Sequence, residues 1–169
     1  MELEATENVW YATRYNSLPI AAAEQLRLAS LAYEHDVKAE MHLALARAIA
    51  PKNPVVKVGE YRYYFYKNRL EEALIVAKEC LLLISQELSL PSDWKNVLPS
   101  SASFTSDEPA LRFYLFCLKA YAYLLLRQDY LEEGREAAEK LMTLDPKNKI
   151  GGQVLIDVLE RAGKDDYDE

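Results

Sequence analysis

Two histidines and two cysteines are the residues of this sequence whose types could ligate a metal ion or act as a nucleophile. His35 and His42 are seven residues apart, so they could share one face of a helix only if that helix ran unbroken between them. His35, however, lies in a polar break of the helical pattern. A metal site also needs further ligands at matching spacing, and the sequence places none there. We therefore expect ordinary surface or partly buried histidines, and no metal site.

The cysteines, Cys80 and Cys117, lie inside apolar stretches, with no Cys-x-x-Cys spacing and no histidine cluster beside them. This pattern favours two reduced, buried thiols over a disulfide or a metal site. Reduced thiols are typical of the cytoplasm, which is the location that we expect for this protein.

Motifs for covalent catalysis or phosphate binding are absent from the sequence. It has no glycine-rich phosphate loop, no Gly-x-Ser-x-Gly and no cysteine with an adjacent histidine. Acidic residues are frequent, but pairs such as Glu71-Glu72 and Glu132-Glu133 are typical of solvated helix faces. We expect no catalysis and no cofactor.

Composition and charge indicate one globular domain with a real core. The chain has 169 residues, half of them apolar and 28% charged, with a formal net charge of −7. This charge disfavours nucleic acid or an anionic membrane as the main partner. The longest apolar runs, 80–84 and 120–126, are far shorter than the roughly 20 residues that span a bilayer. Residues 1–10 carry three glutamates and no basic segment, so no secretory signal is expected.

Proline positions divide the chain into elements. Three stretches without proline, 20–50, 55–90 and 110–145, are rich in good helix formers. Each is too long for one typical helix and has a polar break near its middle, at 34–36, 67–69 and 127–129. Sustained alternation and hairpin dipeptides are absent. The sequence therefore predicts an all-α protein made of helix–turn–helix pairs.

The third pair has the features of a known repeat. Residues 118–148 begin with an Ala/Tyr-rich helix, have Asp129-Tyr130 at the turn, place small residues at 134 and 138, and close with Leu144-Asp145-Pro146-Lys147-Asn148. This segment resembles a tetratricopeptide repeat, and 35–54 and 68–74 resemble it more weakly. The resemblance covers about two-thirds of the chain.

The resemblance implies a right-handed tetratricopeptide-like α-solenoid of antiparallel helix pairs at about 20–50, 55–90 and 110–145. Stacked pairs bury a continuous core that one pair cannot form alone. Small residues at 73, 77, 134 and 138 would let neighbouring helices approach closely. A last amphipathic helix at about 150–162, with Val154, Leu155, Val158 and Leu159 on one side, is expected to cap the stack and to end at Gly163.

In such a solenoid the first helix of each pair lines a concave groove that holds a peptide or a partner helix. The first helices here are aromatic. In the segment Tyr61–Tyr66 we expect Tyr61, Tyr64 and Phe65 to lie in the core, and Arg62 and Tyr66 to share the groove face. Similar spacing gives the full candidate set: Gln25, Tyr33, Arg62, Tyr66, Lys119, Tyr123 and Arg127.

This groove would be locally basic and aromatic, and would suit a peptide that carries an acidic group. Members of the repeat family that clamp a C-terminal carboxylate use a set that includes asparagine. The first helices of the second and third pairs have no asparagine, so we do not expect that particular recognition.

Residues 91–109 do not fit a regular array. This connection contains five serines and a few isolated apolar residues, among them Trp94 and Phe104. Two alternatives are open: a disordered insertion, or a segment in which Trp94 and Phe104 pack onto the solenoid or into its groove, where they are possible contacts.

Three functions fit these observations. The first is an adaptor or scaffold that binds another protein. The second is a cytosolic chaperone of the secretion type, which holds a client in the groove. The third is a structural subunit that self-associates, with Trp10, Tyr11 and Tyr15 as a homodimer contact.

Overall fold

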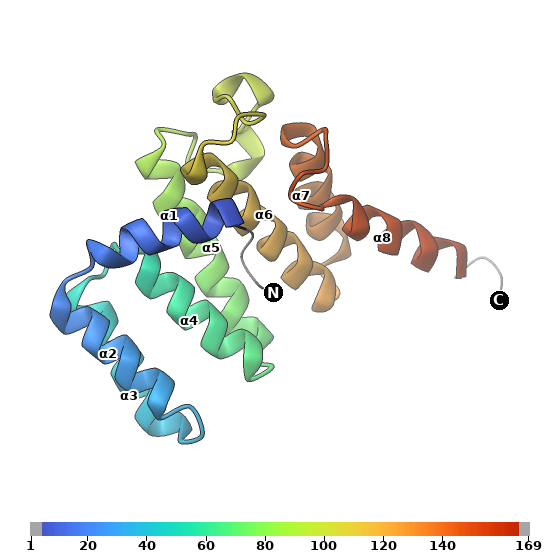
Figure 1. The fold of residues 1–169 in the computed structure, drawn as a ribbon. Coiled ribbons are helices and arrows are strands. Elements are labelled where there is room, and N and C mark those ends of the chain that lie inside the picture. The colour runs from blue at the N-terminus through green and yellow to red at the C-terminus, as the bar shows by residue number, and fades with distance from the viewer. Residues whose placement is uncertain (1–4, 166–169) are drawn as a thin grey trace.

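A computed structural model describes residues 5–165, with the side chains of residues 11–164 (Figure 1). The prediction of an all-α protein is confirmed, since this part of the chain contains no strand. Its helices are α1 (Ala5–Asn16), α2 (Ile20–Leu31), α3 (Asp36–Ile49), α4 (Pro54–Tyr66), α5 (Leu70–Glu87), α6 (Pro109–Arg127), α7 (Leu131–Leu144) and α8 (Gln153–Asp165).

Three helix pairs form the body of the molecule: α2 with α3, α4 with α5, and α6 with α7. Each pair packs on the next, through α3 against α4 and α5 against α6, and α8 packs on α7. Proline opens two of the first helices, at Pro54 and Pro109, where the missing N–H costs no helical hydrogen bond.

The turns inside the second and third pairs have the same construction. Asn68 and Asp129 each adopt a positive φ, 58° and 64°. The next residue in each turn then donates its backbone N–H to a carbonyl five residues earlier, Arg69 to Tyr64 and Tyr130 to Leu125. Asn and Asp tolerate this left-handed conformation. The turns therefore fall at polar breaks that are visible in the sequence.

A close approach of α6 and α7 depends on Gly134. A Cβ at this position would lie 2.6 Å from Cδ2 of Leu126. Ala138, one turn further along α7, is fully buried. A larger residue at position 134 would force the two helices apart.

A buried network of charges joins the first two pairs. The Glu60 carboxylate on α4 is completely buried and accepts hydrogen bonds from the Arg47 guanidinium on α3, with 3.2 Å from Nε to Oε1. The buried ammonium of Lys57 lies 3.8 Å from Glu60 and 2.6 Å from Glu79 on α5. Each buried charge therefore has an opposite charge beside it.

The connection between α5 and α6 is ordered and packed, so the disordered alternative is wrong. The Trp94 ring lies 6.0 Å from that of Tyr121, and the Phe104 ring 6.2 Å from that of Tyr114. Only 6% of Trp94 and 3% of Phe104 is exposed. Lys140 on α7 fixes the segment further by donating to the Val97 carbonyl at 2.7 Å. Both aromatic side chains are therefore part of the core.

The closing motif of the third pair has a clear structural role. The buried carboxylate of Asp145 accepts the backbone N–H groups of Lys149 and Ile150, at 3.1 and 2.8 Å. Asn148 has a φ of 54°, and its side-chain oxygen accepts from the N–H of Gln153, the first residue of α8. These contacts set the direction in which α8 leaves the body.

The C-terminal helix differs from its expected form. Helix α8 continues past Gly163 to Asp165, so the expected stop at this glycine is wrong. Leu155 and Leu159 are buried, whereas Val154 and Val158 are about half exposed. The expected apolar side is therefore only partly covered by α7.

Helix α1 was not expected from the sequence. It lies across α4 and α6, the first helices of the second and third pairs (Figure 1). Its Tyr11 packs against the main core. Part of the surface that the sequence assigned to a partner is thus covered by the chain itself.

Helix α6 is long and apolar enough to cross a membrane by length and composition alone. In the structure, 72% of its most apolar 18-residue segment is buried inside the protein. The core helix of a soluble protein meets the same criterion, so this observation gives only weak support for a membrane span.

Candidate binding groove

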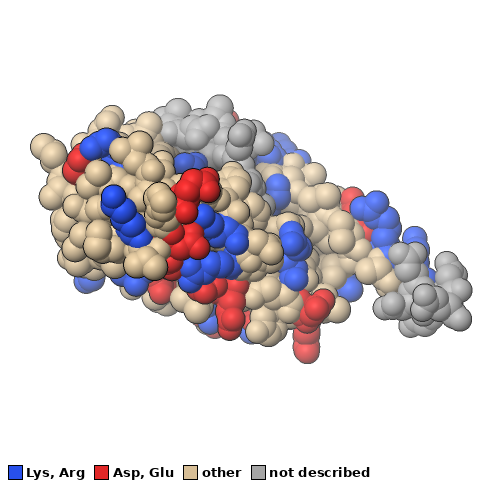
Figure 2. Space-filling model, turned by 90° about the horizontal axis from the view of Figure 1, so that it is seen from below, with Lys and Arg blue, Asp and Glu red and all other residues tan. Residues whose placement is uncertain are grey.

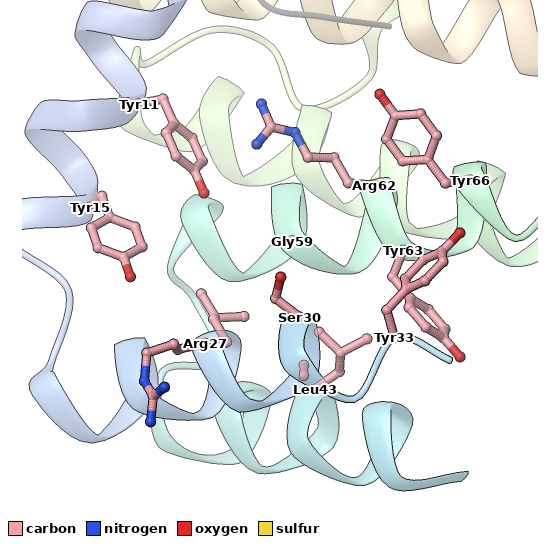
Figure 3. A pocket seen from close by; sticks show the side chains of 12 residues that line it. Tyr11, Tyr15, Arg27, Ser30, Tyr33, Leu43, Gly59, Arg62, Tyr63 and Tyr66 are labelled. Atoms are coloured by element: carbon pink, nitrogen blue, oxygen red, sulfur yellow. The ribbon is translucent and has the colours of Figure 1, made fainter. Parts of the chain in front are cut away.

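A cleft of about 430 Å³ lies between α2 and α4 and is bounded at one end by α1 (Figure 3). Tyrosine predominates in its lining. Tyr11 and Tyr15 come from α1, whereas Tyr33, Tyr63 and Tyr66 lie towards the opposite end. The remaining lining residues are Leu26, Arg27, Ala29, Ser30, Leu43, Gly59 and Arg62.

The floor of the cleft depends on the absence of a side chain at Gly59. A Cβ built at this position would lie 3.1 Å from Cδ2 of Leu26 on α2. Any larger side chain would extend into the space between α2 and α4, as Figure 3 indicates. Gly59 therefore keeps this part of the cleft open and its backbone accessible.

Polar contacts fix the tyrosines at the far end. The buried Tyr63 hydroxyl donates to Asp36 and Glu40 of α3, at 3.3 and 3.4 Å. Its ring meets that of Tyr33 edge-on, with 6.1 Å between the centroids. Burial, together with the two carboxylates, raises the pKa of Tyr63 to about 12. Tyr66 is 56% exposed at the rim, with its hydroxyl directed away from the cleft floor.

The cations around the cleft differ in their partners. Arg27 makes two hydrogen bonds with Glu24, at 2.9 and 2.6 Å, and Lys67 pairs with Asp36 at 2.9 Å. Arg62 has no carboxylate partner among the described side chains, and its guanidinium lies 5.2 Å from the centre of the Tyr11 ring. Burial raises the pKa of Tyr11, and the nearby Arg62 charge partly opposes that rise. Arg62 is therefore the cleft cation with donors left for an incoming anion.

Three of the residues proposed from the sequence, Tyr33, Arg62 and Tyr66, meet in this cleft. Tyr123 and Arg127 lie on α6, where Arg127 donates to the Tyr123 hydroxyl at 2.6 Å. Phe65 links the two groups, with its ring 5.5 Å from that of Tyr66 and 6.2 Å from that of Tyr123.

The other two proposed residues are engaged inside the fold. The Gln25 side-chain oxygen lies 2.7 Å from Nδ1 of His42, so it joins α2 to α3. Lys119 donates to the Ile150 carbonyl at 3.0 Å, beside the turn that leads into α8. The structure thus assigns both to helix packing rather than to the cleft.

Several lining residues were missed as groove residues. Leu26 and Ser30 lie four residues apart on α2, and the proposed Tyr33 follows three residues later in the turn after this helix, so helical spacing back from Tyr33 could have located both. Tyr11 and Tyr15 were expected as a dimer contact but lie against the cleft. The side chain of Trp10, the third residue of that expected contact, lies outside the described part of the structure.

The described residues contain no group of three or more His, Cys, Asp and Glu side chains that could hold a metal ion. The two cysteines are free and buried, with their sulfur atoms 3.8 Å apart between α5 and α6. Burial raises the pKa of the Cys117 thiol, which disfavours the reactive thiolate.

Comparison with known proteins identifies one relative. The chain is 37% identical, over 123 residues, to the uncharacterized 19.8 kDa protein in nifW 5'region of Azotobacter chroococcum mcd 1. The alignment covers 72% of this chain and 69% of that protein. The chain belongs to the same family as that protein. No family model and no solved structure matches the chain, so the tetratricopeptide resemblance stays a prediction.

Proposed function

We propose that this protein is a tetratricopeptide-like, right-handed α-solenoid that binds a segment of another protein and carries out no catalysis. Three successive helix pairs with two matching turns support the architecture. The buried thiols fit a cytoplasmic location. On this proposal the partner is a protein rather than nucleic acid or a membrane, as the net charge of −7 suggests.

One observation carries the proposal: five tyrosines line a cleft whose Arg62 has no carboxylate partner among the described side chains. Tyrosine suits an exchangeable interface, because its ring offers apolar area while its hydroxyl can still bond to water or to a partner. A guanidinium can bind a carboxylate through two parallel hydrogen bonds. The preferred occupant is therefore a peptide or helix with an Asp or Glu side chain next to apolar residues.

The experiment is an affinity capture from an extract of the source organism, followed by mass spectrometry. One bait is the unaltered chain and a second carries Arg62→Ala with Tyr66→Ala. A control bait carries Arg135→Ala with Tyr130→Ala, which makes the same chemical changes at exposed positions of α7 and its turn. All baits are first compared for helical content by circular dichroism.

The proposal predicts proteins that the unaltered and control baits retain and the cleft variant loses. Equal capture by all three baits would remove the cleft as the binding site.

A further inference from the structure

The outer face of α3 carries an apolar ridge that nothing covers in the described structure. Val37, Met41, Leu45 and Ile49 follow one another every four residues, and their exposed fractions are 88, 50, 43 and 42%. The opposite face of the same helix is buried, through Ala39, Leu43 and Ala46. Contiguous exposed apolar surface of this kind marks an interaction site more often than isolated exposed residues do.

The surface has the form that a second helix needs. Residues four apart form a continuous ridge along a helix, and two helices pack when the ridge of one fits the groove of the other. Beside the large ridge of α3 lies a low one, made by the exposed Ala44 and Ala48. A high ridge next to a low ridge is self-complementary, because each copy offers both halves of the contact.

The charges at the two ends of the ridge agree with an antiparallel arrangement. A two-fold axis that passes the exposed face of α3 midway between Met41 and Leu45 would place Val37 beside Ile49 of the second copy, and Met41 beside its Leu45. An antiparallel arrangement brings the end of α3 that Glu34 precedes next to the end that Lys52 follows in the second copy. Both residues are exposed, and neither forms an ion pair within the described part of the chain.

The other charges near the ridge do not oppose this contact. Asp36 is paired with Lys67, and Arg47 with Glu60. Lys38 would lie opposite Ala48 of the second copy, at the edge of the contact. No charge is therefore buried without a partner in this register.

The position of α3 leaves the ridge accessible. Helix α3 belongs to the first pair, at one end of the molecule, and α1 lies on α4 and α6 instead of covering it (Figure 1). This end, at the left in both views, shows mostly uncharged residues, whereas Lys, Arg, Asp and Glu are interspersed over the middle (Figure 2). Terminal repeats of solenoids normally present a polar outer face.

We infer that the ridge Val37–Met41–Leu45–Ile49 is the interface of a symmetric homodimer, in which α3 of one copy packs antiparallel on α3 of the other. This interface is separate from the tyrosine cleft and does not depend on the proposed function.

Sedimentation equilibrium over a wide concentration range tests the inference. The unaltered chain is expected to form a reversible dimer. Met41→Glu combined with Leu45→Glu places like charges against each other inside the contact and raises the dissociation constant at least about tenfold. The matched control is Ile75→Glu with Leu82→Glu, which makes the same kind of change at two exposed apolar residues of α5 and leaves dissociation unchanged.

The charged ends test the register without altering the ridge. Glu34→Lys and Lys52→Glu should each weaken the dimer, because each brings like charges together. The two substitutions combined should restore it. Both positions are exposed, so folding is preserved even if a ridge variant fails to fold.

Three results would overturn the inference: a monomer at every concentration, a dimer that the ridge variant does not weaken, or single charge variants that the combined variant does not restore. A dimer lost through Tyr11→Ala and unaffected by the ridge variant would move self-association to the N-terminal aromatic residues and would also overturn it.

Discussion

The first helix pair has two faces of contrasting chemistry. Its inner face, on the α2 side, borders a cleft rich in tyrosine and close to a guanidinium without a carboxylate partner. Its outer face, on α3, is an aliphatic ridge without an aromatic ring. Partly solvent-exposed aromatic side chains suit a partner that binds and dissociates, whereas an aliphatic ridge suits a contact that remains buried from water. One helix pair can thus serve two kinds of association.

Both faces depend on Glu60, because its carboxylate on α4 holds the first helix pair to the second through Arg47 of α3. Glu60→Ala leaves Arg47 and the buried Lys57 without their shared carboxylate, and should lower the free energy of unfolding by about 3–5 kcal/mol. Urea denaturation followed by circular dichroism measures this loss. Glu24→Ala, which breaks an exposed ion pair on α2, should hardly move the unfolding midpoint. Similar midpoints for the two variants would contradict the structural role of Glu60.

Gly59→Leu should affect binding in the cleft without affecting the α3 ridge. Its side chain would occupy the cleft and crowd Leu26, so partner capture should fall at least about tenfold, at a cost in stability of about 1–3 kcal/mol. Dimer dissociation should not change, because Gly59 faces Leu26 of α2, whereas the ridge lies on the outer face of α3. Pull-down and sedimentation of the same variant provide both readouts. Unchanged capture would show that the partner binds elsewhere.

Arg62→Lys tests whether the cleft recognises a carboxylate by shape as well as by charge. Lysine keeps the positive charge but loses the planar pair of donors, so affinity for a captured partner should fall several-fold, about 1 kcal/mol in binding free energy. Arg62→Ala should lower the affinity further than Arg62→Lys does. Isothermal titration with the captured protein measures both. Equal affinity of the lysine variant and the unaltered chain would indicate a purely electrostatic role.

Tyr63 should give the smallest effect, and only in alkali. Its pKa is raised from the model-peptide value of 10.0 to about 12, so the folded state keeps the hydroxyl proton that the unfolded state loses. This contribution to stability is fully present below pH 10 and is lost as the pH rises towards 12. The midpoint temperature of thermal unfolding should therefore fall less steeply with rising pH for Tyr63→Phe than for the unaltered chain. Tyr130→Phe, at an exposed position, should follow the unaltered chain. If the unfolding midpoint fell equally steeply with pH in both variants, the Tyr63 proton would not be the cause of the alkaline loss of stability.

The all-α fold class could be predicted from the sequence, because the signals for helices and turns are local. Proline positions and polar breaks report the backbone directly, and the turns at Asn68 and Asp129 fall within them. The placement of α1 could not be predicted, because its packing depends on α6, far away in sequence. The burial of Trp94 and Phe104 likewise depends on their docking on α6.

The candidate site was predictable only in part for the same reason. Spacing identifies residues that share a helix face, such as Lys119, Tyr123 and Arg127, but not which neighbour that face meets. Lys119 is engaged because the turn before α8 brings the Ile150 carbonyl to it. Gln25 meets His42 across the α2–α3 contact. These pairings arise from tertiary packing, which helical spacing does not encode.

The docking of α1 on α6 has a consequence for the order in which the protein assembles during synthesis. Most helix contacts join neighbours in the sequence, so each pair can form soon after it leaves the ribosome. Helix α1 emerges before the three helix pairs, yet its main contact is with α6, which begins only at Pro109. At roughly 5–20 residues per second, α6 is completed many seconds after α1. Helix α1 is therefore synthesised before the three pairs but reaches its final position only after α6 has formed, and during that interval Tyr11 is without its place in the core.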